Sequence, residues 1–210
     1  MSTAEIELKF PLLDPAALSS SLPALGFHLV TPRTLEVNML YDSTDRTLAA
    51  VRQILRVRKY GALWTVTHKR APDTSLGLFG RINELASRYK VRYETETTVA
   101  DGESLAAIFD HLGYHPVFRY EKFRAEWADA TGHLVIDETP IGTWAEAEGP
   151  TGWIDETLSR LGVDQKTCIT ESYGRLFTQW KERTGSPARN LTFEEIGDPI
   201  STLEASAIIR

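Results

Sequence analysis

The chain opens with a regular alternation of charged and apolar residues, Glu5-Ile6-Glu7-Leu8-Lys9. Side chains two apart in a β-strand point to the same side, so the charged residues share one face and the apolar residues share the other. A single strand of this kind is typical of an ordinary sheet with one face in solvent. The pattern recurs in at least six stretches of the chain, and the position of so many charged faces therefore decides what the protein can do.

Alternation predicts β-strands along much of the chain, with glycine-containing turns between several of them. After the opening strand, the predicted strands cover 36–41, 53–59, 63–69, 89–99, 118–127, 133–137 and 144–148. Apolar residues at helical spacing, with capping residues at the ends, predict helices over 14–27, 101–114, 151–163 and 172–183. The stretch 72–88 has no clear period, and we expect a long excursion there with a short helix near 82–87.

The many predicted strands favour a sheet that closes on itself, because closure leaves no exposed edge. For any one strand, a solvated outer face with cross-strand ion pairs remains the alternative. However, the faces opposite the charges are apolar enough to lie under helices, which would turn the charged faces inward. We therefore expect a mainly β, α+β fold, a closed barrel with a charged interior and helices packed outside. Such an interior is stable only if its charges neutralise one another or hold an ionic ligand.

Length and composition fit one domain, with 210 residues, 42% hydrophobic and 25% charged. We expect this domain to span 1–185, followed by a C-terminal extension over 186–210 that is either flexible or a strap over the domain. The net charge of −6 argues against a nucleic-acid partner bound through overall basicity. The single Cys168, with no secretory signal and no membrane-length apolar run, predicts a cytoplasmic protein without a membrane partner. Formation of a homodimer stays open.

The charged faces contribute similar numbers of acids and bases to the expected interior. The acids are Glu5, Glu7, Glu94, Glu96, Asp137, Glu146 and Glu148, and the bases are Lys9, Arg56, Arg58, Lys69, Arg92, Lys122 and Arg124. Arginine pairs suit phosphate oxygens, because a planar guanidinium donates two hydrogen bonds at once. Clustered carboxylates without histidine or cysteine suit Mg²⁺ or Mn²⁺ rather than Zn²⁺. A polyphosphate bridged by Mg²⁺ is the ligand that would satisfy both sets.

These residues form an ordered series of motifs over roughly residues 3–180. The series is Glu5-x-Glu7-x-Lys9, Tyr41-Asp42, Arg56-x-Arg58, Thr67-x-Lys69, Arg92-x-Glu94-x-Glu96, Lys122-x-Arg124, Asp137-Glu138-Thr139-Pro140-Ile141-Gly142, Glu146-x-Glu148-Gly149 and Ser172-Tyr173. It resembles the signature of the CYTH superfamily, also called triphosphate tunnel metalloenzymes. That superfamily contains class IV adenylyl cyclases, thiamine triphosphatases and inorganic triphosphatases.

The resemblance implies an eight-stranded antiparallel tunnel that binds a triphosphate-containing small molecule with one or two Mg²⁺ or Mn²⁺ ions. It implies phosphate binding by Lys9, Arg56, Arg58, Lys69, Arg92, Lys122 and Arg124. It implies metal ligation by Glu5, Glu7, Asp137, Glu146 and Glu148, and catalytic roles for Glu5, Glu7, Lys69, Glu146 and Glu148. Tyr41, Glu94 and Glu96 would support them. One departure is Ile54, which stands where animal thiamine triphosphatases have an aromatic residue that stacks on thiamine; this counts against thiamine specificity.

Three functions remain after this comparison of motifs. The first is a metal-dependent hydrolase of tripolyphosphate or of a nucleoside or organic triphosphate, in which water attacks the terminal phosphorus. The alternative is a class IV-type adenylyl cyclase, in which the 3′-hydroxyl of ATP attacks the α-phosphorus to give cyclic AMP and pyrophosphate. The third is a non-catalytic module that binds polyphosphate or a nucleotide. We rank the hydrolase first, because the sequence has no mark of an adenine or ribose site and a pure anion binder needs few carboxylates.

Overall fold

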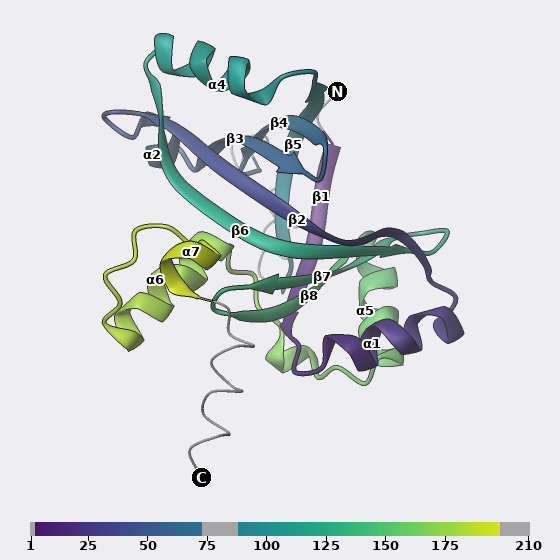
Figure 1. The fold of residues 1–210 in the computed structure, drawn as a ribbon. Coiled ribbons are helices and arrows are strands. Elements are labelled where there is room, and N and C mark those ends of the chain that lie inside the picture. Colours follow the sequence, from purple (N-terminus) through teal and green to yellow (C-terminus); the bar gives the residue numbers. More distant parts are fainter. Residues whose placement is uncertain (1–2, 73–87, 198–210) are drawn as a thin grey trace.

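The structure, a computed structural model, describes residues 3–72 and 88–197, and its eight strands close into an antiparallel barrel (Figure 1). Around the barrel the strands follow the order β1-β5-β4-β3-β2-β6-β7-β8. Their bounds are β1 Thr3–Pro11, β2 His28–Ser43, β3 Gln53–Tyr60, β4 Leu63–Arg70, β5 Lys90–Val99, β6 Tyr114–Ala128, β7 His133–Thr139 and β8 Gly142–Glu148. The expected closed barrel is therefore confirmed.

The four predicted helices are present, two of them between strands and two after the last strand, β8. These longer helices are α1 (Pro15–Ser21), α4 (Gly102–His111), α5 (Thr151–Arg160) and α6 (Tyr173–Thr184); the short ones are η1 (Leu22–Leu25), α2 (Thr47–Ala50), η2 (Gln165–Thr167) and α7 (Phe193–Ile196). Asp14 and Asp101 accept backbone hydrogen bonds at the starts of α1 and α4. Gly26 follows η1 with φ of 89°, a left-handed conformation that glycine adopts without steric cost.

The structure differs from the predicted elements mainly in the lengths of two strands. β2 begins at His28 and β6 at Tyr114, so both extend beyond the predicted 36–41 and 118–127. The first half of β2 is largely exposed and contains bulges near Leu29 and Thr31, which interrupt the alternation on which the prediction relied. The short α2 carries too few residues to show a helical period. The helix expected near 82–87 lies outside the described residues.

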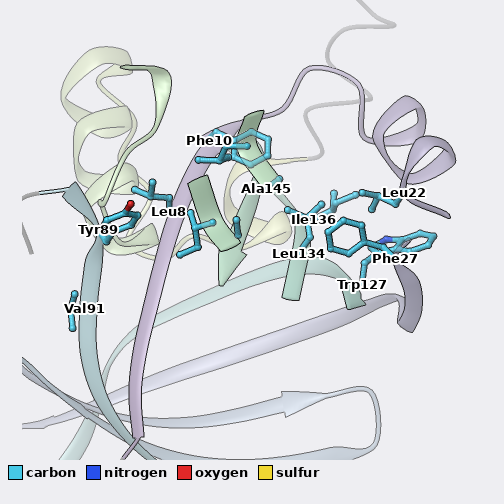
Figure 2. Packing of buried hydrophobic residues seen from close by; sticks show 13 residues of the cluster. Leu8, Phe10, Leu22, Phe27, Tyr89, Val91, Trp127, Leu134, Ile136 and Ala145 are labelled. Carbon is cyan, nitrogen blue, oxygen red and sulfur yellow. The ribbon is translucent and has the colours of Figure 1, made fainter. Parts of the chain in front are cut away.

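The main hydrophobic core lies between the outer face of the barrel and the helices α1 and α5 (Figure 2). Leu8 and Phe10 of β1 point outward into it, as the alternation predicted, and Ile154 and Leu158 of α5 pack against the same cluster. Leu134 and Ile136 of β7 complete its centre. Each fully buried side chain of this size contributes about 1.5–3 kcal/mol. Because the helices cover the apolar, outward faces of these strands, the charged faces of the strands point into the barrel.

A second cluster joins α6 and the following segment to β6 and β8. Phe177 and Leu191 are buried against a set that includes Phe118 and Trp144. Leu191 donates a backbone hydrogen bond to Arg119 and its carbonyl accepts one from Glu121, so residues 186–197 form a strap across β6. This strap anchors α6 beside one end of the barrel interior. Among the described helices, none is both long and apolar enough to span a membrane.

Candidate functional site

The barrel interior contains a cavity of about 720 Å³ whose wall is mostly charged side chains. The alternation within each strand places them there, since every second residue points inward. The residues predicted for the interior that line it are Glu5, Glu7, Lys9, Arg56, Arg58, Lys69, Arg92, Glu94, Glu96, Lys122, Arg124, Glu146 and Glu148. Asp137 lies behind this wall, with no exposed surface. The structure thus brings residues from six strands to one ionic cavity.

The opening motif supplies three groups to the cavity, each with a charged partner on another strand. Glu5 accepts a hydrogen bond from Lys69 at 2.7 Å, and Glu7 accepts one from Lys90 at 2.6 Å. Lys9 is fully buried and is paired with Glu146. The register explains two of these pairs, because Glu7 is opposite Lys90 and Lys9 is opposite Glu146. Lys69 is on β4 and reaches Glu5 across the intervening strand β5.

Four cations gather on β3 and β6, which flank β2 across the barrel from β1 and β8. Arg58 donates to both carboxylate oxygens of Glu96, at 2.8 and 2.9 Å. Arg56 donates to the hydroxyl groups of Thr67 and Tyr120, each at 3.2 Å, and its Nε has no hydrogen-bond partner among the described residues. With Lys122 and Arg124 of β6, these arginines form what we call the cation wall. Its guanidinium groups match phosphate oxygens in geometry and charge.

Asp137 orients the β6 members of the cation wall. It accepts from Lys122 at 2.8 Å, from Arg124 Nε at 2.7 Å and from the Tyr173 hydroxyl at 2.7 Å. Arg124 also donates to Glu146 at 2.8 Å. A metal ion at Asp137 would have to displace one of these donors, because they use most of the acceptor sites of the carboxylate. The geometry therefore favours a supporting role for Asp137 over the ligand role that the resemblance implied.

Glu5, Glu7 and Glu148 form an acidic corner on β1 and β8. Burial, and next the negative charges of Glu5 and Glu7, raise the pKa of Glu148 to about 7. Glu148 has no ion-pair partner among the described residues. In contrast, the pKa of Glu146 lies well below its usual value, because Lys9 and Arg124 outweigh the effect of burial. The acidic corner is the part of the cavity where an added cation would relieve the most repulsion.

The donors at this corner fit Mg²⁺ or Mn²⁺, since they are carboxylate oxygens without histidine or cysteine beside them. Within the described ranges, no three acidic, histidine or cysteine side chains are close enough together to form a complete metal site. Mg²⁺ commonly binds through one or two carboxylates, with water and substrate phosphates completing its shell. The corner thus fits an ion that arrives with a phosphate ligand.

Tyr41, expected as a supporting residue, points away from the cavity. Its ring packs edge-on against Phe109 of α4, with ring centroids 5.4 Å apart. The neighbouring Asp42 accepts backbone hydrogen bonds from Leu48 and Ala49 at the start of α2. Inward and outward residues alternate along β2, and Leu40 takes the inward position. The Tyr41-Asp42 motif therefore holds α4 and α2 in place and does not contact the cavity.

Several cavity residues were not assigned a role from the sequence. Lys90, Tyr120 and Tyr173 line the cavity, and the fully buried Glu36 and Asn38 lie next to the cation wall. The alternation of β5 places Lys90 on the same face as Arg92, so the sequence indicated its direction but gave it no role. The ring of Tyr173 lies 4.0 Å from Lys9 Nζ, a cation–π contact. Its position depends on the packing of α6, which no local pattern reveals.

A second, smaller cavity of about 340 Å³ adjoins the first at the turn between β6 and β7. The two cavities share Ala4, Glu5, His133 and Glu148. The remainder of the smaller wall is uncharged: Ile6, Thr131, Gly132, Gly149 and Pro150. The ring of Trp153 lies behind Gly132, where a Cβ atom would come within 2.7 Å of it. This cavity suits an uncharged group attached to an anion in the barrel.

The structure thus defines a closed antiparallel β-barrel whose acids and bases face one internal cavity. The family model for the CYTH domain matches residues 3–149, and the chain belongs to this family.

The relatives match this chain over most of its length. A Methanocaldococcus jannaschii protein named "putative adenylate cyclase" is 24% identical over 80% of this chain and 95% of its own length. A solved Vibrio parahaemolyticus structure, also described as a "putative adenylate cyclase", has a TM-score of 0.70 at 15% identity, covering 85% of this chain and 99% of that chain. A Hippeastrum structure, described as a "putative adenylyl cyclase" with a dominant triphosphatase activity, has a TM-score of 0.57 at 21% identity, covering 86% and 96%.

Proposed function

We propose that the protein is a Mg²⁺- or Mn²⁺-dependent triphosphatase that releases the terminal phosphate of tripolyphosphate or of a nucleoside or organic triphosphate. The observation that carries this proposal is the cavity itself, in which a cation wall lies across the barrel from an acidic corner. A triphosphate with a divalent cation is a ligand that satisfies both surfaces. The activity described for the Hippeastrum protein is consistent with this choice.

In this proposal the side chains divide the work by charge. Arg56, Arg58 and Arg124, with Lys9, Lys69, Arg92 and Lys122, bind the phosphate oxygens and stabilise the charge that develops on them during transfer. Glu5, Glu7 and Glu148, with Glu146 beside them, hold the metal ion and take the proton of the attacking water. The metal ion would neutralise phosphate charge and polarise that water. Glu94, Glu96 and Asp137 fix the directions of the cations through their ion pairs.

The second candidate is an adenylyl cyclase that makes cyclic AMP and pyrophosphate from ATP. The names of the relatives from Methanocaldococcus and Vibrio favour it. The smaller cavity also supports it, because a base needs an uncharged pocket next to the phosphates. The same pocket would serve the organic part of a hydrolysed triphosphate, so it does not separate the two reactions.

One assay separates the candidates. The purified protein is incubated with Mg²⁺ or Mn²⁺ and either tripolyphosphate or ATP, and orthophosphate, pyrophosphate and cyclic AMP are measured. We expect orthophosphate from tripolyphosphate. Cyclic AMP and pyrophosphate from ATP without orthophosphate from either substrate would establish the cyclase instead. Saturable binding of tripolyphosphate without any product would leave only a binding module.

We also propose a cytoplasmic location, on the basis of the single unpaired Cys168.

A further inference from the structure

Glu36 is an anion enclosed by the cation wall. It lies on β2, between the strands that carry the wall, and has no exposed surface. Its carboxylate oxygens lie 3.4 Å from Lys122 Nζ, 3.6 Å from Arg58 Nη1 and 3.8 Å from Arg124 Nε. These three cations lie on both sides of β2, so a single carboxylate contacts three of the four members of the cation wall.

These contacts supply charge but do not orient the cations. The short hydrogen bonds of Arg58 go to Glu96, and those of Lys122 and Arg124 go to Asp137. The hydrogen bond that Glu36 accepts comes from the Asn38 amide at 2.9 Å, and its Oε2 has no hydrogen-bond partner among the described residues. Although burial opposes its ionisation, Lys122, Arg124 and Arg58 hold the pKa of Glu36 far below its usual value. Glu36 is therefore a permanent negative charge behind the phosphate-binding groups.

A charge in this place changes how strongly the cavity holds an anion. At an effective dielectric constant of about 20, two unit charges about 10 Å apart change a binding constant by roughly ten-fold. Tripolyphosphate and pyrophosphate carry several negative charges, so Glu36 weakens the binding of both. Weak product binding favours turnover, because product release limits many enzymes.

We propose that Glu36 is a built-in counter-anion that limits how tightly the cation wall holds polyphosphate, so that the product can leave. This inference rests on the proposed function, in that it takes a polyphosphate as the ligand of the cavity. In this role Glu36 does not touch the ligand and does not orient the cations; its negative charge offsets part of their charge and repels the bound anion. If Glu36 only held the cation wall in shape, its removal would weaken polyphosphate binding, whereas a counter-anion role predicts that its removal strengthens binding.

The test is the isosteric variant Glu36→Gln. The amide oxygen of the new side chain can still accept the hydrogen bond from Asn38 that Glu36 accepts. Binding of tripolyphosphate and of pyrophosphate, each with Mg²⁺, is measured by isothermal titration calorimetry. We expect both to bind at least about ten-fold more tightly, with a lower KM and a lower kcat for tripolyphosphate. Glu138→Gln is the matched control; it removes the same charge from a residue paired with Arg33 outside the cavity, and should leave binding unchanged.

The outcomes are distinguishable. If the wild-type protein neither binds nor hydrolyses tripolyphosphate, the proposed function fails. If the wild type binds it and Glu36→Gln binds no more tightly, the role of Glu36 fails alone. Without Glu36, repulsion among the cations should lower the melting temperature of the ligand-free Glu36→Gln variant. Added tripolyphosphate should then raise the melting temperature of the variant by more than it raises that of the wild type. Should the variant unfold without ligand, refolding in the presence of tripolyphosphate would support the proposal, and failure to refold would overturn it.

Discussion

The hydroxyl of Tyr173 donates a hydrogen bond to Oδ2 of Asp137 over 2.7 Å, and this bond connects α6 to the group that orients Lys122 and Arg124. Both partners are buried. The position of a helix outside the barrel is therefore coupled to the directions of two phosphate-binding candidates inside it.

The first prediction concerns this bond. Tyr173→Phe keeps the ring that contacts Lys9 and removes the donor to a buried carboxylate. We expect a loss of about 1.5–3 kcal/mol in the free energy of unfolding, since a hydrogen bond to a charged group is lost without replacement. Urea unfolding measures it. Tyr114→Phe is the control, because the Tyr114 hydroxyl has no hydrogen-bond partner among the described residues; an equal loss there would contradict the assignment.

The second prediction concerns the catalytic machinery. Glu7→Ala should remove a metal ligand, and Arg56→Ala should remove a phosphate donor; each should lower kcat/KM for tripolyphosphate by about 10²–10³-fold or more. Circular dichroism should show an intact fold in both variants. Activity within a few-fold of wild type in either variant would refute the proposed site. Glu138→Gln serves again as the control, with activity unchanged.

The third prediction concerns the acidic corner and metal removal. Glu148→Gln removes a charge that Glu5 and Glu7 repel. We therefore expect the metal-free variant to melt at a higher temperature than the metal-free wild type at pH 8. Added Mg²⁺ or Mn²⁺ should stabilise the wild type more than the variant, because binding to the folded state stabilises it. If Glu148→Gln melts at a lower temperature than the wild type in EDTA, and added metal raises both melting temperatures equally, Glu148 does not bind the ion.

These residues also show what the sequence could and could not predict. The inward direction of Glu5, Glu7 and Lys9 follows from the period of a strand, and the helices that cover Leu8 and Phe10 make that direction necessary. Glu36 gave no such signal, because its inward neighbours on β2 are Asn38 and Leu40 rather than further charges. Its importance comes from strands β3 and β6 on either side, which only the register of the barrel reveals.

The fourth prediction is a pH dependence of stability. The Tyr89 hydroxyl donates to Asp155 at 2.7 Å, and burial together with this carboxylate raises the pKa of Tyr89 from 10.0 to about 12. Because the folded state favours the neutral phenol, Tyr89 contributes its stability below pH 10 and loses it as the pH rises toward 12. The difference in unfolding free energy between wild type and Tyr89→Phe should therefore shrink between pH 9 and pH 12. A difference that stays constant over this range would contradict it.

The fifth prediction concerns the smaller cavity, whose wall includes the exposed His133. A bulky residue there should exclude the organic part of a substrate and leave room for bare phosphates in the larger cavity. His133→Trp should therefore lower kcat/KM for ATP by at least about ten-fold more than for tripolyphosphate. His111→Trp places the same side chain on the exposed end of α4 and should change neither value. If kcat/KM falls equally for both substrates, His133 lies beside the phosphates. If it falls for neither, the organic group binds elsewhere.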